Sequence, residues 1–343
     1  MQMYIPKYKL SPSLLSSLTQ IERLYGQLEV LRIPKNLEVN LERINLIKST
    51  YISNSIEGNP LSMPEVTNLI LGDRVPANRD EKEVRNYFDI LKNLENLQKN
   101  QFSIQLTLKI HQELLSGVNE RITGKIRNRK VVIGSYRKEN GKMVLAVKHE
   151  PLFHTKERIK QALNQLFDWL IKDKRIPKVI KTGIFHHQFV FIHPFEDGNG
   201  RVCRLLTSLL LMQYGYQVNK YFVLDDWYDV DRILYSDKLH SADSGDKTQW
   251  LEYFSEGMKY SLQGALSKVK SAFETLNIES RPTPKEKEVL KLFQSIHEMT
   301  STDVAGKLKI SRQQAHSLLS SLLKKDFLDK KGRTKSSYYF LKQ

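Results

Sequence analysis

Residues 193–204 read His-Pro-Phe-Glu-Asp-Gly-Asn-Gly-Arg-Val-Cys-Arg, and they hold the residue types that phosphate chemistry needs. Gly198 and Gly200 flank Asn199 where a strongly apolar segment begins, so the backbone can turn and approach a ligand closely. The first amides of a helix have no partner within the helix, and the helix dipole is positive there. A glycine turn that opens a helix therefore predicts a cradle for an anion.

The side chains around this turn complement such a cradle. Arg201 and Arg204 are three positions apart and project from one face of the first helical turn, where guanidinium groups suit phosphate oxygens. Asp197 precedes the turn and can ligate a hard cation such as Mg²⁺. His193 can accept a proton near neutral pH. Each feature alone is usually structural, but their occurrence within twelve residues indicates a phosphate-handling site.

The pattern of apolar residues predicts a mostly helical protein around this segment. Ser62 and Glu65 form a capping box with proline in the first turn, so a helix begins there. Two β-prone runs, 130–133 and 143–147, predict a hairpin. Helices are expected at residues 41–57, 62–71, 80–99, 103–115, 155–174, 177–192, 199–216, 226–241 and 248–276.

The C-terminal part differs in charge and pattern. The chain carries a net charge of +16, and residues 281–343 have 14 Lys or Arg against 6 Asp or Glu, a net charge of +8. Residues 277–284 contain two prolines and read as a linker. The pattern that follows, with helices at 284–294, 301–308 and 311–324 and strands at 327–329 and 338–341, is typical of a winged helix-turn-helix.

A unit of this kind can bind DNA or dock a protein, and the sequence does not distinguish between these two functions. Side chains near the start of the third helix would face a DNA groove, and the basic turn would contact phosphates. A docking module for protein has the same helical pattern. The groove side chains are Arg312, Gln313, Gln314 and His316, and the wing side chains are Lys330, Lys331, Arg333 and Lys335.

The bulk properties exclude several classes of protein. Of the 343 residues, 40% are hydrophobic and 27% are charged, which is ordinary for a soluble globular protein. No apolar stretch reaches the roughly 18 residues of a membrane span, and the N-terminus has no secretion signal. Cys203 is the only cysteine, so an intrachain disulfide is impossible. A cytoplasmic location is the simplest expectation.

The segment 193–204 resembles the signature of Fic-domain proteins, His-Pro-Phe-x-Asp-Gly-Asn-Gly-Arg-x-x-Arg, at every invariant position. The resemblance implies a mostly α Fic-type helical bundle with a small β-hairpin flap, followed by the C-terminal winged-helix domain. It implies an N-terminal helical region at 1–99, a catalytic core at 100–278 and the winged helix-turn-helix at 279–343.

The resemblance also implies an activity, the transfer of AMP from ATP to a Tyr, Thr or Ser hydroxyl of a protein, including the chain itself. His193 would be the general base, and Asp197 would bind Mg²⁺. The remaining contacts to ATP would come from the backbone of Gly198, Asn199 and Gly200, from Arg201 at the β-phosphate and from Arg204 at the γ-phosphate.

Two further parts resemble family elements. The stretch 123–134 is similar to the family's flap, in which an exposed edge holds a target segment by strand addition. Tyr235 falls where the family often supplies a ring near the nucleoside, although a packed helix tyrosine fits equally well. The flap residues are Val131, Val132, Ile133 and Gly134.

Ser53-Asn-Ser-Ile-Glu57-Gly58 resembles the family's inhibitory motif. In that interpretation Glu57 pairs with Arg204 and keeps it from the γ-phosphate. Ser53 lies one helical turn earlier on the same side, where it would steady the carboxylate or touch phosphate. The alternative is an ordinary glutamate at a helix end beside a glycine cap.

Several readings of the function stay open at this level. The enzyme could remove AMP from a modified protein, with Glu57 orienting water, or transfer another nucleotide such as UMP. A DNA-binding regulator whose Fic core senses nucleotide is the alternative from another class. Dimerisation is common among similar proteins, so a homodimer is a further expectation.

Overall fold

The computed structural model describes residues 4–342 apart from 32, 34, 73, 140–141, 281, 294–295 and 333–336. Arg333 and Lys335, expected in the wing, thus lie outside the described residues. The chain divides into two compact units, Met1–Ser267 and Lys268–Gln343, and each is described by itself. The structure is mostly helical with small antiparallel strands, as the sequence predicts.

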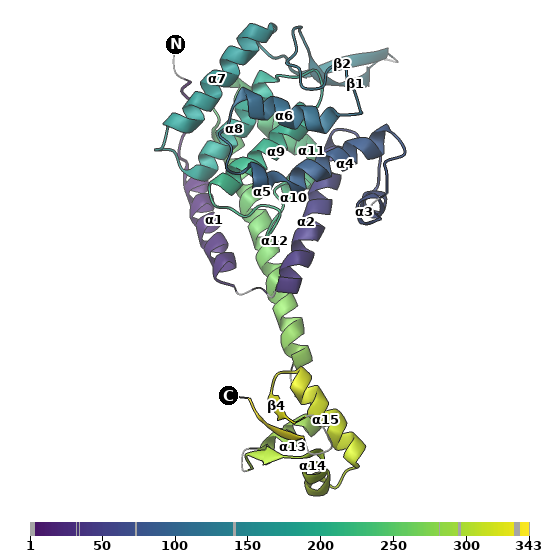
Figure 1. The fold of residues 1–343 in the computed structure, drawn as a ribbon. Coiled ribbons are helices and arrows are strands. Elements are labelled where there is room, and N and C mark those ends of the chain that lie inside the picture. The colour runs from purple at the N-terminus through teal and green to yellow at the C-terminus, as the bar shows by residue number, and fades with distance from the viewer. Residues whose placement is uncertain are drawn as a thin grey trace. The chain divides into compact units, whose positions relative to one another are not determined.

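Helices build almost the whole first unit (Figure 1). In chain order they are α1 (Pro12–Val30), α2 (Lys35–Ile56), α3 (Met63–Leu71), α4 (Arg79–Lys92), α5 (Leu94–Leu97), α6 (Ile104–Leu115), α7 (Lys156–Lys172), α8 (Lys178–Ile192), α9 (Asn199–Gln213), α10 (Asp225–Val230), α11 (Arg232–Ser241), the 3₁₀ turn η1 (Ala242–Ser244) and α12 (Thr248–Ser280), which continues beyond this unit.

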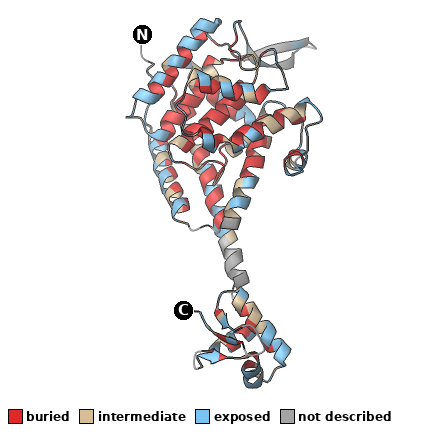
Figure 2. Ribbon diagram, in the orientation of Figure 1, coloured by how far each residue is buried: buried red, intermediate tan, exposed pale blue. Residues whose placement is uncertain are grey.

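Helix α9 is the buried centre of this unit, as its apolar sequence predicts. Every residue from Arg201 to Met212 is buried. Most of α8 is buried as well, and it packs on α9, so red dominates the central helices in Figure 2. Because α8 and α9 are consecutive, the loop between them is held rigidly at the core.

Local signals explain where several helices begin. The capping box at Ser62 and Glu65 is present at the start of α3. Ser103 caps α6, its side chain accepting a hydrogen bond from the Leu106 amide. Helix α2 ends at Ile56, and Gly58 follows with φ of 89°, which confirms it as a terminator.

The hairpin differs in extent from the expectation. Strands β1 (Ile133–Glu139) and β2 (Lys142–His149) pair antiparallel at the edge of the unit (Figure 1). Val131 and Val132 therefore precede β1 instead of forming its centre. The pairing carries the strands into the polar segment that was expected as a loop, since the ladder satisfies backbone groups whatever the side chains.

Three other boundaries depart from the expectations. The segment expected as one helix at 80–99 is split at Asn93, and the one at 226–241 is split at Asp231, whose side chain caps α11. Residues 277–280, expected in the linker, continue α12. Proline disfavours the helical conformation at the residue before it, so Pro282 is compatible with a helix that ends at Ser280.

The second unit contains α13 (Pro284–Phe293), α14 (Ser301–Leu308), α15 (Arg312–Lys324) and the strands β3 (Glu298–Met299), β4 (Leu328–Lys331) and β5 (Tyr338–Leu341). The strands form an antiparallel sheet in the order β3-β5-β4. The short β3 was not expected. An apolar cluster that includes Val289, Leu319 and Tyr339 joins the helices to the sheet.

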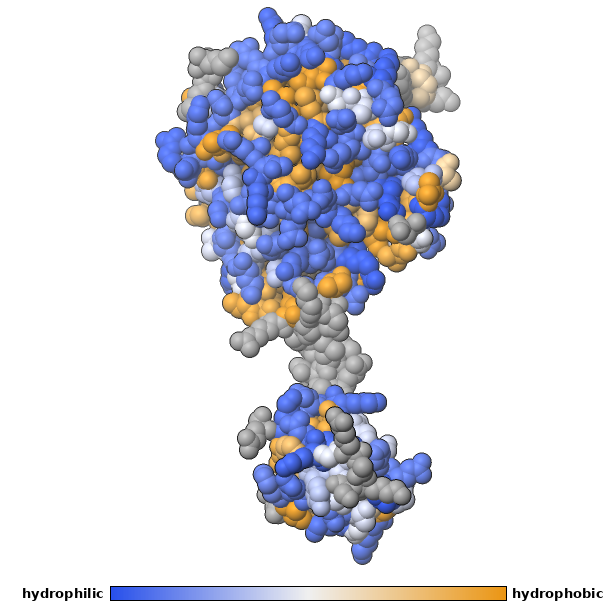
Figure 3. Space-filling model, in the orientation of Figure 1, coloured by the Kyte–Doolittle hydropathy of each residue, from blue (hydrophilic) through white to orange (hydrophobic). Residues whose placement is uncertain are grey.

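No helix in the described part of the chain is long and apolar enough to cross a membrane. Hydrophilic residues dominate the visible face of the first unit, and apolar residues form patches between them (Figure 3).

Candidate active site

The loop between α8 and α9 is fixed by backbone conformations at both ends. His193 ends α8 in the left-handed region, with φ of 50° and ψ of 65°. Gly198 begins α9 with φ of 78°, a conformation that favours glycine. A Cβ on Gly198 would lie 3.3 Å from the Leu114 side chain, so glycine also permits close packing.

Two buried side chains of this loop, Asn199 and Phe195, stabilise its conformation. The side-chain amide of Asn199 accepts a hydrogen bond from the Phe195 N–H at Oδ1 (2.9 Å), and its Nδ2 donates one to the Phe195 carbonyl (3.0 Å). Phe195 is fully buried, and its ring stacks on the imidazole of His111 with 3.7 Å between centroids. The Asn199 side chain is therefore committed to the loop, which leaves its backbone amide for a ligand.

His111 supports the loop through a defined tautomer. The Gly124 amide donates to its Nδ1 (3.0 Å), so Nε2 carries the hydrogen and donates to the Asp197 carbonyl (3.1 Å). Burial lowers the pKa of His111 to about 4, so the ring is neutral at physiological pH. No sequence pattern singled out this residue, because it lies 86 positions from its partner.

We expect His111→Phe to destabilise the protein by about 1–3 kcal/mol, because it keeps an aromatic ring on Phe195 but leaves two partly buried backbone groups, the Gly124 N–H and the Asp197 carbonyl, without this partner. Urea unfolding measures the change. His111→Ala also removes the stacked ring and should cost more. Equal stability of His111→Phe and wild type would show that the two hydrogen bonds do not hold the loop.

Arg127 fixes the end of α8 at His193. Its guanidinium donates to the carbonyls of His193 (2.6 Å), Ile192 (3.2 Å) and Arg129 (2.7 Å). A cation at a helix C-terminus also interacts favourably with the helix dipole. Arg127 is 2% exposed, so these hydrogen bonds are shielded from water. Sequence reasoning placed Arg127 only in the flap segment and missed this role.

The His193 imidazole is neutral in this setting. Burial lowers its pKa to about 3, and the positive charge of Arg127 acts in the same direction. Nδ1 is buried without a hydrogen bond of normal geometry to any described residue. A neutral ring held by its backbone can accept a proton, which is what a general base requires.

Arg201 is held by a partner that the sequence did not reveal. Its Nη1 donates to Glu83 of α4 (2.8 Å), and its Nη2 lies 3.4 Å from Asp197 Oδ1. The Arg201 side chain is 3% exposed, and its Nε is buried with no partner among the described residues. The carboxylates thus neutralise Arg201 and orient it, while one donor stays unused.

Arg204 and Glu57 meet at the start of α9. Arg204 Nη2 donates to Glu57 Oε1 (2.8 Å) and to the Ser53 carbonyl (2.8 Å), and Nε donates to the Ser53 hydroxyl (2.7 Å). A Cβ on Gly200 would collide with the Glu57 carboxylate. The carboxylate therefore lies directly on the glycine where the sequence predicts an anion, and Ser53 steadies the arginine.

Tyr235 is a packed tyrosine. It is 6% exposed, its ring stacks on Tyr228 with 4.2 Å between centroids, and its hydroxyl lies 3.0 Å from His186 Nε2. This environment favours the structural alternative over a contact with a nucleoside.

The flap residues occupy the beginning of the hairpin. Val132 and Gly134 are exposed, whereas Val131 and Ile133 are half-buried. Gly134 and Val147 face each other beside a bulge at Ile133. Because the hairpin has only two strands, the outer edge of β1 has no strand beside it among the described residues.

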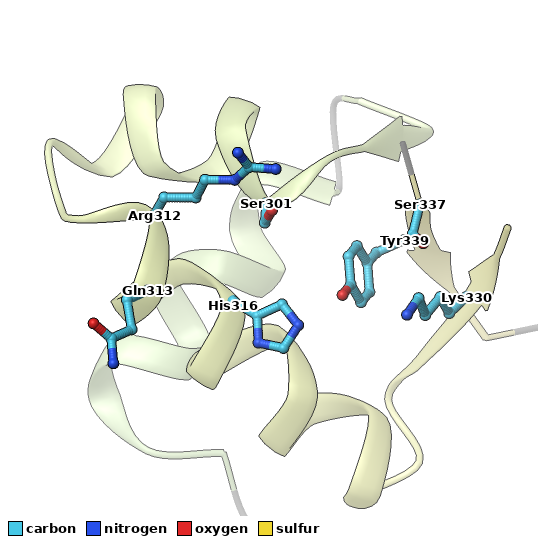
Figure 4. Close-up of a pocket in the computed structure, with 7 residues that line it drawn as sticks. All are labelled: Ser301, Arg312, Gln313, His316, Lys330, Ser337 and Tyr339. Carbon is cyan, nitrogen blue, oxygen red and sulfur yellow. The ribbon is translucent and has the colours of Figure 1, made fainter. Parts of the chain in front are cut away.

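A second candidate surface lies in the second unit. A groove of about 430 Å³ is lined by Arg312, Gln313 and His316 of α15 together with Lys330 and Tyr339 of the strands (Figure 4). Lys331 is exposed. The Gln314 side chain accepts a hydrogen bond from the Ser311 amide (3.1 Å), so it serves as part of a helix cap.

Part of this chain matches a known protein family, and named relatives are similar to it. The model of the Fic/DOC family matches residues 101–211. Protein adenylyltransferase fic-1 of Caenorhabditis elegans is 28% identical over 251 residues, which are 70% of this chain and 45% of that protein. Protein adenylyltransferase Fic of Nematostella vectensis is 30% identical over 175 residues, covering 48% of this chain and 37% of its own. The chain thus spans less than half the length of these relatives.

A solved structure extends the similarity to the whole fold. A Fic family protein from Desulfovibrio desulfuricans G20 is 25% identical and has a TM-score of 0.68, covering 99% of this chain and 98% of that one. The loop geometry, the family match and the shared fold agree, and residues 101–211 of this chain are a Fic domain of the Fic/DOC family.

Proposed function

We propose that this chain is a protein adenylyltransferase that moves AMP from ATP to a Tyr, Thr or Ser hydroxyl and is held inactive by Glu57. The observation that carries the proposal is the Glu57 carboxylate, which lies on Gly200 and binds Arg204. An anion already occupies the start of α9, so the site is suited to phosphate. Relatives named protein adenylyltransferase support the reaction type.

The residues fit a triphosphate. Because Gly200 has no side chain, an anion can approach the first amides of α9 closely, as the Glu57 carboxylate does here, and the helix dipole favours negative charge there. The unpartnered Nε of Arg201 and the guanidinium of Arg204 supply charged donors, the second once Glu57 has withdrawn.

Asp197 fits a role in holding Mg²⁺. Its side chain is 40% exposed, and its hydrogen bonds with Gly198 and Arg201 both involve Oδ1. Oδ2 therefore remains for a cation, and carboxylate oxygen is a ligand that Mg²⁺ prefers. Bound there, the ion would neutralise phosphate charge.

The transfer itself requires one proton acceptor. His193 takes the proton of the target hydroxyl, and the oxygen forms a bond to the α-phosphorus of ATP. The bond between the α-phosphorus and the bridging oxygen breaks, and pyrophosphate leaves with that oxygen. The neutral imidazole and its clamped backbone suit this role. The backbone edge of β1 would hold the target segment by strand addition.

Intact-mass spectrometry tests this function. Glu57→Gly protein is incubated with Mg²⁺ and each of the four nucleoside triphosphates in turn. We expect an added AMP with ATP. An adduct with UTP alone would identify transfer of another nucleotide, and no adduct with any of the four would contradict the proposal. Loss of AMP from labelled protein after addition of wild type would reveal the reverse reaction.

We propose DNA binding as a second function, carried by the second unit. The specific observation is the groove in Figure 4, where Arg312 of α15 and Lys330 of β4 line one hollow. A helix beside a basic strand pair is the arrangement by which winged helices read DNA, with cations on phosphates. The net charge of +8 over residues 281–343 favours a polyanion.

Binding of the full chain to a DNA duplex should weaken steeply with salt. With about three phosphate contacts, the logarithm of the association constant should fall with the logarithm of salt with a slope of about −3. Fluorescence anisotropy at several salt concentrations measures this slope. Lys331→Ala, which removes an expected phosphate contact, should reduce its size by about 1, and Arg312→Ala, which removes an expected groove contact, should weaken binding.

Lys285→Ala is the matched control, because Lys285 is exposed on α13 and does not line the groove. It should leave the slope nearly unchanged. Absence of binding at low salt would favour a protein-docking role for this unit.

A further inference from the structure

A cluster of three histidines surrounds one carboxylate in the first unit, and the proposed reaction uses none of them. Asp243 of η1 lies 2.7 Å from Nδ1 of His149, 3.1 Å from Nδ1 of His240 and 2.9 Å from Nε2 of His187. His149 ends β2, His187 lies in α8 and His240 lies in α11. Three separate elements and η1 therefore converge at one acidic group.

The hydrogen positions on His149 imply a cation at this point. Its Nε2 lies 3.1 Å from the Phe191 carbonyl, which can only accept, so Nε2 carries a hydrogen. In a neutral ring Nδ1 then presents a lone pair to the Asp243 carboxylate 2.7 Å away. Two acceptors at that distance attract only with a cation between them, either a second proton or a metal ion.

The groups around the cluster resemble the outer shell of a metal site. Lys247 Nζ donates to His187 Nδ1 (2.8 Å), so His187 Nε2 carries the hydrogen and donates to Asp243 Oδ1. That bond fixes the carboxylate and leaves Oδ2 toward His149 and His240. Metal-ligating histidines usually donate their other N–H to a carbonyl, as His149 does to Phe191.

We propose that His149 Nδ1, His240 Nδ1 and Asp243 Oδ2 bind a divalent transition-metal ion, with Zn²⁺ as the best match. The three ligand atoms lie within 4.8 Å of one another. Two imidazoles with one carboxylate form a ligand set of zinc, whereas Mg²⁺ prefers oxygen alone. This ion would be distinct from the one assigned to Asp197.

The surroundings permit an ion to enter and give it a role. Asp243 is 23% exposed at its side chain, and it is the one of the three ligands that lines a hollow of about 260 Å³. A bound ion would fasten the end of β2 to α11, where Lys148 already donates to the Ser236 hydroxyl (3.0 Å). The metal would thus anchor the base of the hairpin that is proposed to hold the target.

Titration calorimetry with Zn²⁺ tests the site on full-length protein first treated with a chelator. We expect one Zn²⁺ bound with a dissociation constant of about 1 μM or tighter. Asp243→Asn should weaken binding by roughly 100-fold or more. His154→Gln is the control, because His154 is exposed and outside the cluster, and it should bind Zn²⁺ as wild type does.

A second variant keeps the test decisive if Asp243→Asn does not fold. His240 is 16% exposed at its side chain, so His240→Gln should fold, and it should also lose Zn²⁺ binding by at least 10-fold. Circular dichroism checks folding of each variant. Absence of Zn²⁺ binding by wild type, or unchanged binding by folded His240→Gln, would overturn the proposal and assign the cation at His149 to a proton.

Discussion

Glu57→Gly is expected to raise self-adenylylation by about 10- to 150-fold over wild type in an assay with labelled ATP. A hydrogen bond between charged groups contributes about 1.5–3 kcal/mol, which corresponds to that range in an equilibrium. The Glu57–Arg204 contact is such a bond, at 2.8 Å, and Arg204 is 2% exposed. Its removal releases the guanidinium from the carboxylate and clears the space above Gly200.

The effect is attributable to the inhibitory contact because Glu57 lies outside a helix. Helix α2 ends at Ile56, so glycine at position 57 breaks no helical turn. The Arg204 guanidinium also keeps its two bonds to Ser53. The variant should therefore fold as wild type does.

Two further variants separate charge from bulk. Glu57→Gln keeps a group of the same size over Gly200 but removes the charge, so it should activate less than Glu57→Gly. Glu157→Gln removes an exposed carboxylate of α7 and should leave labelling at the wild-type level. If wild type and Glu57→Gly label at the same rate, Glu57 does not inhibit the enzyme.

The local parts of this site could be predicted from the sequence, because their geometry depends on neighbours in the chain. Gly198 and the apolar run after it set the turn and the helix that follows. Ser53 and Glu57 are one helical turn apart, so a shared face was predictable. Their distinct contacts with Arg204 required the fold, since the arginine lies 151 positions from Ser53.

The supporting residues could not be predicted, because nothing local marks them. Glu83 lies in an ordinary charged helix segment, and its contact with Arg201 spans 118 positions. Arg127 and His111 read as a basic loop residue and a lone helix histidine. The packing of α4 and α6 beside α9 brings Glu83 and His111 to the loop, and Arg127 reaches it from the segment after α6, where its backbone amide donates to the Pro194 carbonyl (3.0 Å). These supporting residues hold Arg201 and the loop between α8 and α9 in position, and such support is what makes the geometry of a site precise.

In the Glu57→Gly background, His193→Ala is expected to reduce labelling by about 10²–10⁴-fold, the usual contribution of a general base. Binding of Mg²⁺ and ATP should change little, because the phosphates are assigned to the backbone of α9 and to the two arginines. Calorimetry measures the binding, and labelled ATP measures the rate. Retained labelling would exclude His193 as the base.

The pH dependence of the rate shows whether His193, acting as the base, has a lowered or an ordinary pKa. Burial lowers the pKa of His193 to about 3, so the neutral form that accepts protons persists as the pH falls from 8 to 5. An imidazole with an ordinary pKa of about 6.5 would lose most of its activity over that range. The Glu57→Gly enzyme should therefore keep its rate down to about pH 5. A loss of rate with a midpoint near 6.5 would mean that water reaches the His193 ring during the reaction, although its Nδ1 is buried in this structure.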